Sequence, residues 1–600
     1  MPARGRRLRH SAILGPPLVA LALLVAGVPS AAAGTTPGTA TLSASRAELV
    51  YGRALRLTGR VTSADPGCVA GRPADLQGRE PGQSSWTVLK SKSTGNDGSF
   101  SFWRRPAHTS SYRVVLPDYV TADASCAQVI SPRVASTVDA RVKLTVATPL
   151  VAGNCSHLSI AVSPSKPGTP VELEQLGRDG WGTILSGTLT DASDASGSVC
   201  YGWSSIGSVR LRATWPAPDP LNAVGASPAI ALHVVKAPWM AHIDQLTAGH
   251  SVSVAVASGP TTLYERADGV RHAPASNEKL LLSMALLERL GPGRRIVTRT
   301  AATNVSNGRV HGALWIIGRG DPTTNKPAMA ALAAEVASAG IHRVGRVIGA
   351  VSYFSHDWWA HGWRWFFRSD EVALPTALTY HGNVVGGRHV RDPERWAAVA
   401  LTKALQNHGV KVVRKPAARR PPAGLHTVAS IESGSLQGLL RRQNVHSDNF
   451  DAEVLGKFLG AQRSGRPGTI AKGAAAIRAF ASSHGVSISA YDSSGLSYAN
   501  RVTALGLVRL LRVAESSSWG RALRGTLAAP GEGTLEDRLR GVPVRAKTGT
   551  LHDISALSGW VRLSRTGRWA RFSILSSGFD ASREKDIEDG IVRTLWKYGH

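Results

Sequence analysis

The stretch Pro274-Ala275-Ser276-Asn277-Glu278-Lys279-Leu280 opens a helix that the sequence predicts to run to about Leu290. The residues after Lys279 are almost all apolar, and Gly291-Pro292 ends the run. A helix that is apolar on every side is buried, so we expect this one at the centre of a large domain. Ser276 and Lys279 are three residues apart and therefore share a face of the helix's first turn.

A serine and a lysine at this spacing predict nucleophilic catalysis. A serine hydroxyl is a poor nucleophile at its ordinary pKa and needs a neighbouring base. A lysine in a site of low dielectric loses its proton more readily and can be that base. The N–H groups at the start of a helix also favour the negative charge that develops during acyl transfer. The same spacing recurs at Ser163–Lys166 and Ser582–Lys585 without such a helix, so the pattern alone is weak.

The length and composition indicate a globular protein of several domains. At 600 residues the chain is too long for one core, and its 43% hydrophobic content is enough for several. The formal net charge is +29, but Lys and Arg are scattered and accompany no nucleic-acid-binding motif, so we expect no nucleic acid partner. Anionic cell-wall polymers are the partners that a basic exported protein would meet.

The first 33 residues predict a secretory signal peptide. Four arginines precede an apolar run from about 12 to 28, and Ala31-Ala32-Ala33 offers a small-residue cleavage site. We therefore expect the protein outside the cytoplasm, in the extracellular, cell-wall or periplasmic space. An N-terminal membrane anchor is the alternative if the peptide is not cleaved. No later apolar stretch reaches the length of about 18 residues that predicts a second membrane span.

All four cysteines lie in the N-terminal part of the chain. In an oxidising compartment an even number of cysteines favours disulfides. We expect the pairs Cys68–Cys126 and Cys155–Cys200, because each pair then falls within one predicted domain. Zinc binding is the alternative, but these spacings match no zinc finger or ribbon.

Residues 38–236 read as β structure. Runs at 55–62 and 112–116 alternate apolar and polar residues, and Gly, Pro, Asp and Ser separate such runs. Trp86 followed by 98–102 is echoed by Trp181 followed by 197–201, which indicates a distant duplication with units of about 100 residues. We therefore expect two immunoglobulin-like β-sandwiches, at 38–138 and 139–236, each serving either as a wall-binding arm or as a plain spacer.

Residues 238–600 read as one domain with an insertion at about 295–430. Strands predicted between 252 and 265, and the three that follow Arg545, would form one antiparallel sheet packed by helices. Residues 356–367 are the most aromatic stretch of the chain, which is either a platform for stacking a sugar or a peptide or a packing cluster between domains. The histidines in this region show no metal-ligand spacing, so we expect no metal.

Two further motifs follow the first along the chain. Ser447-Asp448-Asn449 lies near the middle of a helix predicted from Leu436 to Gly460, and Lys547-Thr548-Gly549 belongs to a predicted strand. Ser447 can relay a proton to a leaving nitrogen, and Asn449 can hold a substrate amide. Lys547 can place a positive charge near a terminal carboxylate.

The strand that holds the third motif has a second expected role. Gly549 would let the strand come close to a substrate, and the backbone N–H groups of Ser276 and Thr550 would form an oxyanion hole. The candidate catalytic residues are thus Ser276, Lys279, Ser447, Asn449 and Lys547, and the candidate substrate-binding residues are Thr548, Gly549 and Thr550.

The three motifs, in this order, resemble those of the class C low-molecular-mass penicillin-binding proteins, a family of D-alanyl-D-alanine carboxypeptidases and endopeptidases. Similar blocks stand at 274–280, 314–323, 492–497 and 546–551, so the resemblance covers about 240–600. It implies an α/β (α+β) penicillin-binding/β-lactamase-like serine transpeptidase fold with an inserted domain. Ser493 stands where the family usually has glycine, which leaves the geometry of that loop open.

The resemblance implies hydrolysis of the terminal D-Ala-D-Ala bond of peptidoglycan stem peptides, or of D-amino-acid crosslinks, through an acyl-enzyme on Ser276. It also implies inhibition by β-lactam antibiotics and a reaction that needs no cofactor.

Two other functions remain as alternatives. A serine β-lactamase shares the motifs, but no glutamate lies between Glu453 and Glu515 to activate the deacylating water of class A enzymes. Class C β-lactamases normally have tyrosine where this chain has Ser447. A non-catalytic wall-binding protein is the other hypothesis, and the presence of Ser276, Lys279 and Lys547 argues against it.

Overall fold

The structure, a computed structural model, describes residues 34–578 and 580–599. The signal peptide expected at 1–33 lies outside these residues. The described chain forms two compact units. The first comprises the residues up to 145 together with 159–196 and 212–229, and the second comprises 146–158, 197–211 and the residues from 230 onward.

The N-terminal part of the first unit consists of strands. They are β1 (Gly38–Ala40), β2 (Ser43–Ala44), β3 (Glu48–Val50), β4 (Leu55–Ser63), β5 (Pro73–Arg79), β6 (Thr87–Ser93), β7 (Ser99–Arg104), β8 (Ser110–Leu116), β9 (Tyr119–Val120), β10 (Ser125–Cys126), β11 (Val129–Ile130) and β12 (Val134–Asp139). One sheet has the order β1-β4-β2 with β7 paired to β4, and another has the order β3-β12-β8-β5-β6 with β11 paired to β8. Leu57 and Phe102 from the first sheet share a buried core with Leu76 and Val114 from the second, so the two sheets pack face to face.

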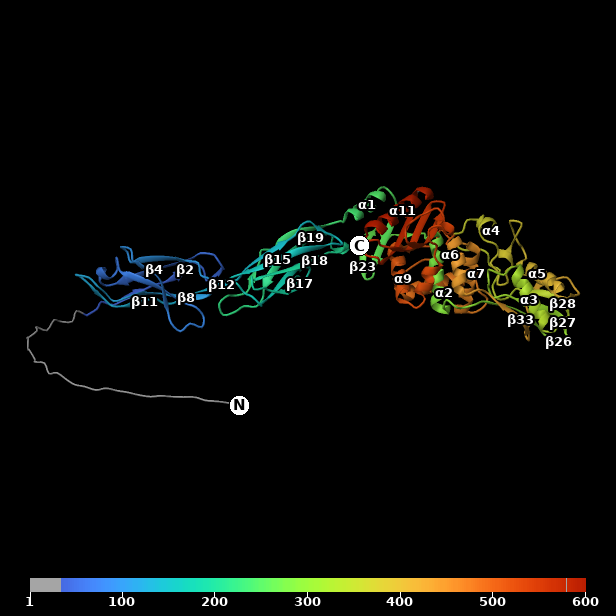
Figure 1. The fold of residues 1–600 in the computed structure, drawn as a ribbon, viewed down its shortest axis with the longest axis horizontal. Helices are drawn as coiled ribbons and strands as arrows, with labels where there is room; N and C mark the ends of the chain where they lie inside the picture. Colours follow the sequence, from blue (N-terminus) through green and yellow to red (C-terminus); the bar gives the residue numbers. More distant parts are fainter. Residues whose placement is uncertain (1–33, 579, 600) are drawn as a thin grey trace, which may run out of the picture. The chain divides into compact units, whose positions relative to one another are not determined.

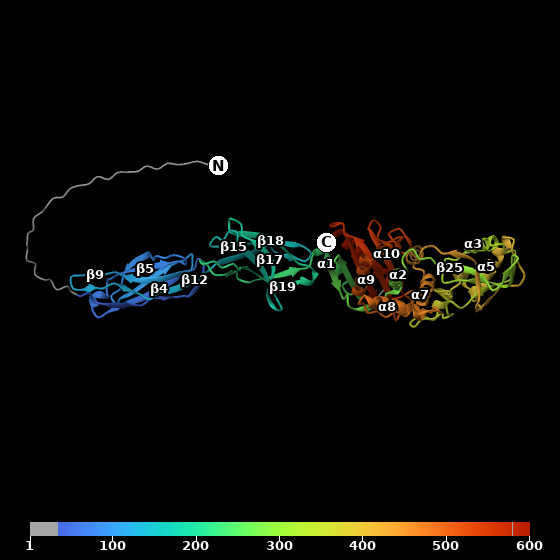
Figure 2. The same ribbon diagram turned by 90° about the horizontal axis from the view of Figure 1, so that it is seen from below.

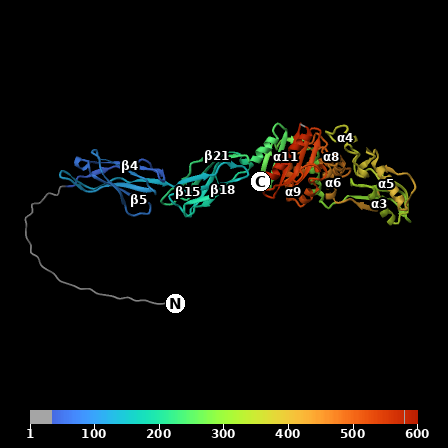
Figure 3. The same ribbon diagram turned by 45° about the horizontal axis from the view of Figure 1, so that its top comes forward.

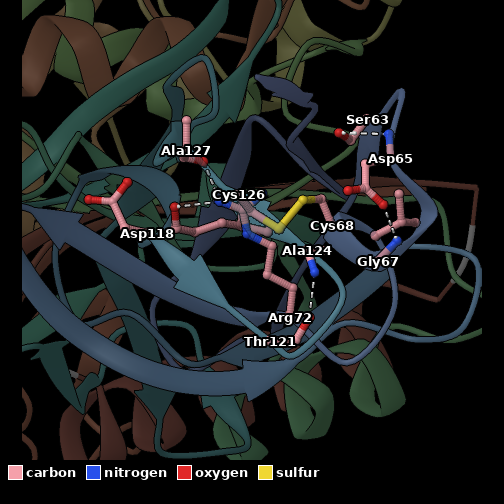
Figure 4. The surroundings of a disulfide bond; sticks show 12 residues. Ser63, Asp65, Gly67, Cys68, Arg72, Asp118, Thr121, Ala124, Cys126 and Ala127 are labelled. Atoms are coloured by element: carbon pink, nitrogen blue, oxygen red, sulfur yellow. Dashed lines mark hydrogen bonds between the residues drawn. A yellow bond between two sulfur atoms is a disulfide. The ribbon is translucent and has the colours of Figure 1, made fainter. Parts of the chain in front are cut away.

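A disulfide joins Cys68 to Cys126 in this part of the chain, and both residues are buried. Figure 4 shows Arg72 beside the bond. The Arg72 side chain is buried, and its Nη2 donates hydrogen bonds to the carbonyl oxygens of Pro117 and Ala127. Burial lowers the pKa of Arg72, although Asp118 opposes the shift. The disulfide and Arg72 therefore connect the loop that holds Cys68 to the segment after β8.

The chain from 141 to 235 is again made of strands. They are β13 (Arg141–Val146), β14 (Leu150–Val151), β15 (Cys155–Ser163), β16 (Pro170–Gly177), β17 (Gly180–Thr188), β18 (Asp194–Cys200), β19 (Gly207–Trp215), β20 (Gly225–Ala226) and β21 (Ile230–Val235). In the first unit β16 pairs with β17, and β20 pairs with the end of β19. In the second unit β14 and the start of β19 pair with β21, and a disulfide joins Cys155 to Cys200. Both disulfides join the cysteines that the sequence favours as pairs.

A five-stranded antiparallel sheet organises the second unit from residue 252 onward. Its strands are β22 (Val252–Ser258), β23 (Thr261–Arg266), β35 (Val544–Leu551), β36 (Ile554–Arg562) and β37 (Trp569–Ser577). Their order is β23-β22-β37-β36-β35, and every neighbouring pair is antiparallel. This confirms the sheet predicted from strands at both ends of the region.

Helices cover both faces of this sheet (Figure 1 and Figure 3). On one face α11 (Ala581–Tyr598) packs against β36 and against α1 (Pro238–Leu246), and Ser555 of β36 donates a hydrogen bond to Glu588 of α11. Ala556, the next residue, points to the opposite face and joins the main core, where α9 (Ala504–Ser516) packs against β22 and β37. This alternation explains why β36 is buried along almost its whole length.

The helix predicted after Lys279 is the central helix of that core. It is α2 (Glu278–Leu290), preceded by a 3-10 turn at Ala275–Asn277, and its residues from 278 to 287 are all buried. The helices that pack against it are α6 (Leu436–His446), α7 (Asn449–Ser464), α8 (Ile470–Ser483) and α10 (Gly520–Thr526), and α9 shares the same core. A run of leucines is therefore needed on every side of α2.

The single helix predicted from Leu436 to Gly460 is wrong, because the chain breaks at the Ser447-Asp448-Asn449 motif. Helix α6 ends at His446, and Ser447 adopts a left-handed conformation with φ of 56°. Asp448 then caps the next helix by accepting a hydrogen bond from the N–H of Asp451. Serine and aspartate favour such turns and caps over helix interiors. The break points both ends of the motif into one cleft.

The inserted region is built on its own sheet. Its strands are β25 (Val297–Ala302), β26 (Val305–Ser306), β27 (Arg309–Ile317), β28 (Arg343–Ala350), β31 (Lys411–Val412), β32 (Ala417–Arg419) and β33 (His426–Glu432). The sheet has the order β31-β28-β27-β25-β33, with β26 paired to β27 and β32 to β28. Figure 2 shows α3 (Lys326–Ser338) and α5 (Pro393–Asn407) beside this sheet, and both helices share its core.

The segment between β28 and α5 returns to the main core. Phe354, Ala373 and Ala377 join the apolar cluster around α2, and a short helix, α4 (Phe367–Asp370), lies between them. Two small ladders complete the fold: β24 (Arg271–His272) pairs with β34 (Val502–Thr503), and β29 (Val384–Val385) pairs with β30 (Arg388–His389). Within the described residues, no helix has the length and apolar character needed to cross a membrane.

Candidate active site

Ser276 lies in a tight turn at the head of the central helix. The preceding residue, Ala275, has φ of 45°, which is uncommon for residues other than glycine. Its carbonyl group packs against Gly495, where an added Cβ would lie only 1.9 Å from Ala275 O. The loop at 492–497 therefore supports the turn that presents Ser276.

Lys279 is fully buried, and its amine is surrounded by oxygen atoms. Its Nζ lies 3.0 Å from Ser276 Oγ, 2.7 Å from Asn449 Oδ1 and 2.6 Å from the carbonyl oxygen of Ser494. Burial lowers the pKa of Lys279 to about 8, although the charge of Asp492 opposes this shift. A neutral amine is therefore well populated near pH 8.

The two carbonyl acceptors determine how a neutral Lys279 amine is oriented. Amide and peptide oxygens can only accept hydrogen bonds, so the two N–H bonds of the neutral amine go to Asn449 and Ser494. The lone pair is then left for the third neighbour, Ser276 Oγ. This arrangement can take the proton from the serine hydroxyl.

Lys547 lies on β35 next to the hydroxyl of Ser447. Its Nζ donates hydrogen bonds to Ser447 Oγ at 2.9 Å and to the carbonyl oxygen of Thr548 at 2.8 Å. Burial, and then repulsion from Lys279, lowers the pKa of Lys547 well below its usual value. An anion entering the cleft would favour the protonated amine of Lys547 and would raise this pKa again.

Strand β35 runs along the turn that holds Ser276. A Cβ added to Gly549 would lie 2.8 Å from the carbonyl oxygen of Pro274 and 3.1 Å from the nitrogen of Ser276, so only glycine allows this approach. Thr548 Oγ1 donates a hydrogen bond of 2.8 Å to Thr534 Oγ1. Thr550, on the same strand, lines the same cleft as Ser276.

These groups share a cleft of about 590 Å³. The structure brings together in its wall Ser276, Ser447, Asn449, Thr548, Gly549 and Thr550, with Lys279 and Lys547 buried directly behind Ser276 and Ser447. Every candidate site residue of the three motifs therefore belongs to one site, whereas the cysteine pairs lie elsewhere in the chain.

The cleft also contains residues that the three motifs do not reveal. Phe366 and Phe367 line one wall, and Arg538 and Lys585 line another part. Phe366 and Phe367 belong to the aromatic stretch at 356–367 that the sequence singles out. Some side chains of this stretch are buried, such as Trp363 and Phe367, whereas Trp365 is 81% exposed. Lys585 belongs to the weak Ser582–Lys585 match, and only the fold places it here.

Glu371 is the acidic residue of the cleft wall. Its Oε2 accepts a hydrogen bond of 3.0 Å from Asn449 Nδ2. Because Lys279 donates to the other end of the same amide, the two contacts fix which way the Asn449 amide points. Glu371 follows α4 in the segment that returns from the inserted sheet, so the insertion contributes directly to the site.

The loop at 492–497 is built around the carboxylate of Asp492. This carboxylate accepts hydrogen bonds from Trp363 Nε1, from the N–H groups of Gly495 and Ser497, and from Asn500 Nδ2. Ser493 is buried in this loop, next to Gly456 of α7. The serine thus fits a loop that is otherwise held by hydrogen bonds.

The histidines of the inserted region are separate from this site. His356 Nε2 lies 2.8 Å from Glu394 Oε1, and this contact raises the pKa of the histidine. Across the described ranges, no group of three or more histidine, cysteine or acidic side chains is arranged to hold a metal ion.

The site combines a buried lysine beside a serine hydroxyl with a second lysine on the adjacent edge strand. Together with a sheet covered by helices on both faces, this arrangement is that of serine enzymes with the penicillin-binding fold. The model of the D-Ala-D-Ala carboxypeptidase 3 (S13) family matches residues 239–385 and 377–598. The chain belongs to this family and is a serine-type D-Ala-D-Ala carboxypeptidase. The match confirms the resemblance seen in the sequence.

Relatives and solved structures agree with this assignment. The D-alanyl-D-alanine carboxypeptidase of Actinomadura sp. (strain R39) is 29% identical over 64% of this chain and 89% of that protein. The carboxypeptidase DacB of Mycolicibacterium smegmatis is 30% identical over 52% of this chain and 73% of that protein. Penicillin binding protein 4 (dacB) from Haemophilus influenzae has a TM-score of 0.53 at 20% identity, and the match covers 59% of this chain and 99% of that chain. A structure of the same protein in complex with a novel β-lactam has a TM-score of 0.51 at 18% identity, covering 60% and 99%. These structures show the fold.

Proposed function

We propose that Ser276 is the nucleophile of a D-alanyl-D-alanine carboxypeptidase or endopeptidase and that Lys279 is its general base. The orientation of Lys279 is the observation that carries this proposal. Its two N–H acceptors, Asn449 Oδ1 and Ser494 O, leave its lone pair for the Ser276 hydroxyl 3.0 Å away. Its lowered pKa makes the neutral form accessible without a second base.

The proposed reaction proceeds in two steps. The oxygen of Ser276 attacks the carbonyl carbon of the penultimate D-Ala while Lys279 takes the hydroxyl proton, and the backbone N–H groups of Ser276 and Thr550 stabilise the oxyanion. The C–N bond then breaks, a proton passes through Ser447 to the leaving nitrogen, and D-Ala or the crosslinked amine departs. Water hydrolyses the ester and restores Ser276. All groups are supplied by the chain, so the proposed reaction uses no cofactor.

The remaining motif residues would bind the substrate. Lys547 would attract the terminal carboxylate, and its contact with Ser447 would keep that hydroxyl ready to relay a proton. Asn449, which also lines the cleft, would hold the amide of the stem peptide. Thr548, Gly549 and Thr550 would pair with the substrate along β35.

The natural substrate would be a peptidoglycan stem peptide, and β-lactam antibiotics would acylate the same serine. The relatives support both statements, since two are named carboxypeptidases and the structure from Haemophilus influenzae was solved with a β-lactam. We place the protein outside the cytoplasm on the strength of its N-terminal sequence. Its net charge of +29 favours anionic wall polymers as further partners.

The domain limits belong to the same proposal. We propose immunoglobulin-like sandwiches at 38–138 and 139–236, and a catalytic domain at 238–600 with an insertion at about 295–430. Support for the first sandwich comes from two sheets around one core. Support for the insertion comes from its own core and sheet, whose last strand ends at Glu432.

The release of D-Ala from a stem-peptide mimic tests this function. We expect the wild-type protein to release D-Ala from a peptide ending in D-Ala-D-Ala and to spare the same peptide ending in D-Ala-L-Ala. Ser276→Ala should lose this activity because it removes the nucleophile. Lys279→Arg should lose it because arginine keeps its proton at all relevant pH values. Full activity in either variant would contradict the proposal. A crosslinked muropeptide assayed in parallel separates carboxypeptidase from endopeptidase activity.

A further inference from the structure

Helix α7 is connected to Lys279 in two ways, by a direct contact and through Ser494. Asn449, its first residue, accepts a hydrogen bond from Lys279 directly. Glu453, four residues later, lies on the same side of the helix and is fully buried. Its Oε1 accepts hydrogen bonds from the N–H groups of Ser493 at 3.0 Å and Ser494 at 2.8 Å.

The contact between Glu453 and Ser494 is important because Ser494 also contacts Lys279. The carbonyl oxygen of Ser494 accepts the shortest hydrogen bond of the Lys279 amine, at 2.6 Å, while the N–H group of the same residue is held by Glu453. One residue therefore connects the carboxylate to the base. If Ser494 moved, the Lys279 amine would lose one of the two hydrogen bonds that direct its lone pair toward Ser276 Oγ.

Glu453 also belongs to a group of buried acids behind Ser276. Glu278, next to Lys279 in the sequence, is fully buried, and its Oε1 finds no hydrogen-bond partner among the described residues. Burial and the neighbouring charges of Asp492 and Glu453 raise the pKa of Glu278 well above its usual value, which favours its neutral form. Asp492, the third acid of this group, accepts hydrogen bonds from Trp363 Nε1, the N–H group of Ser497 and Asn500 Nδ2.

Glu453 differs from Glu278 because two backbone N–H groups stabilise its charge. Burial raises the pKa of Glu453 to about 7, and the charge of Asp492 adds to the shift, while the hydrogen bonds from Ser493 and Ser494 oppose it. The two backbone N–H groups thus favour the charged form of Glu453 close to Lys279. Other charged groups that face Lys279 are Asp448, Glu371 and Lys547, and those that face Glu453 or Glu278 include Lys457 and Arg478.

We propose that Glu453 is a positioning residue for the acyl-transfer reaction: its carboxylate holds Ser494 so that Lys279 faces Ser276. The negative charge of this carboxylate also favours the protonated form of the Lys279 amine. The proposal rests on Lys279 acting as the base of the proposed function. It gives a buried side chain outside the three motifs two separable roles, one geometric and one electrostatic.

Two substitutions separate these roles. Glu453→Gln keeps an oxygen that can accept from Ser493 and Ser494 but removes the negative charge. We expect the acid limb of kcat/KM for D-Ala release to move to lower pH by about one unit, because the protonated amine loses a favourable neighbour. Glu453→Ala removes the acceptor as well. We expect its kcat to fall about tenfold to a hundredfold at every pH, with a smaller change in KM, because the base is misplaced.

Glu278→Gln is the matched control, since it removes a neighbouring buried carboxyl group whose raised pKa favours the neutral form. We expect its pH profile to coincide with that of the wild type. Circular dichroism and the melting temperature check folding, and if Glu453→Ala does not fold, Glu453→Gln carries the test alone. An acid limb that stays in place in Glu453→Gln, or one that moves equally in Glu278→Gln, would overturn the electrostatic role. A kcat that stays at the wild-type level in a folded Glu453→Ala variant would overturn the positioning role. A wild-type profile without any such limb would overturn the proposed function together with this inference.

Discussion

A Cβ atom on Gly456 would lie 2.0 Å from the Oγ atom of Ser493. Helix α7 and the loop at 492–497 are thus in contact at a point where one partner has no side chain. The family that this chain resembles usually has glycine at the position of Ser493. Here the residue without a side chain is Gly456 on the helix. The loop keeps its glycine at 495, where a Cβ would meet Ala275 O at 1.9 Å.

This contact predicts that Gly456→Ala displaces the loop and lowers the rate of acylation. Overpacking a buried contact typically costs about 1–3 kcal/mol, and here the strain falls on the segment that contacts Lys279. The rate of labelling by a fluorescent penicillin measures the effect. Ser493→Gly should restore the rate in the Gly456→Ala background and change little by itself. Equal losses with and without Ser493→Gly would show that the two positions are not coupled.

The burial of Lys279 predicts how activity depends on pH. The pKa of about 8 means that the amine is mostly protonated at pH 6 and mostly neutral above pH 9. Because only the neutral amine can accept the proton of Ser276, kcat/KM for D-Ala release should rise through this range. A pH series in buffers of constant ionic strength measures the limb. A flat profile from about pH 6 to pH 9 would argue against Lys279 as the base.

The position of Lys547 predicts selectivity for a free carboxylate. Glutamine at this position can still bond to Ser447 but carries no charge, so Lys547→Gln should lower kcat/KM for a peptide with a terminal carboxylate by about tenfold to a hundredfold. The same peptide with a terminal carboxamide should lose much less. A similar loss for both peptides would show that Lys547 acts on Ser447 and not on the carboxylate.

The disulfide of the N-terminal region predicts a separate loss of stability. Replacing Cys68 and Cys126 by alanine removes a crosslink between residues 58 positions apart and should lower the free energy of unfolding of this region by about 2–4 kcal/mol. Denaturation followed by tryptophan fluorescence measures the change. D-Ala release should stay at the wild-type level, with the Cys155→Ala/Cys200→Ala variant as a comparison. A parallel loss of activity would show that the N-terminal strands support the catalytic region.

The parts of the fold that depend on strong local patterns could be predicted from the sequence. The leucine-rich run after Lys279 predicted a buried helix, and the alternating strands near Val252 and after Arg545 predicted one antiparallel sheet, as the structure has it. The helix expected to continue through Ser447 was wrong. Its apolar pattern continues across the motif, and only the left-handed Ser447 and the capping Asp448 divide it.

The site was predicted only as far as its motifs. Ser276, Lys279, Ser447, Asn449 and Lys547 come together in the structure, as their order along the chain suggested. Glu371 and Glu453 could not be placed in advance. The first depends on how the inserted region folds back onto the cleft, and the second on a loop whose serine replaces the expected glycine.

The mass of the protein after incubation with a penicillin tests the central claim most directly. We predict that the wild-type protein gains the mass of one penicillin, that peptide mapping places the adduct on Ser276, and that Ser276→Ala gains nothing. The adduct should persist for long enough to be isolated. An adduct on the Ser276→Ala variant would contradict the assignment of the nucleophile, and rapid loss of the penicillin without any adduct would indicate a β-lactamase instead.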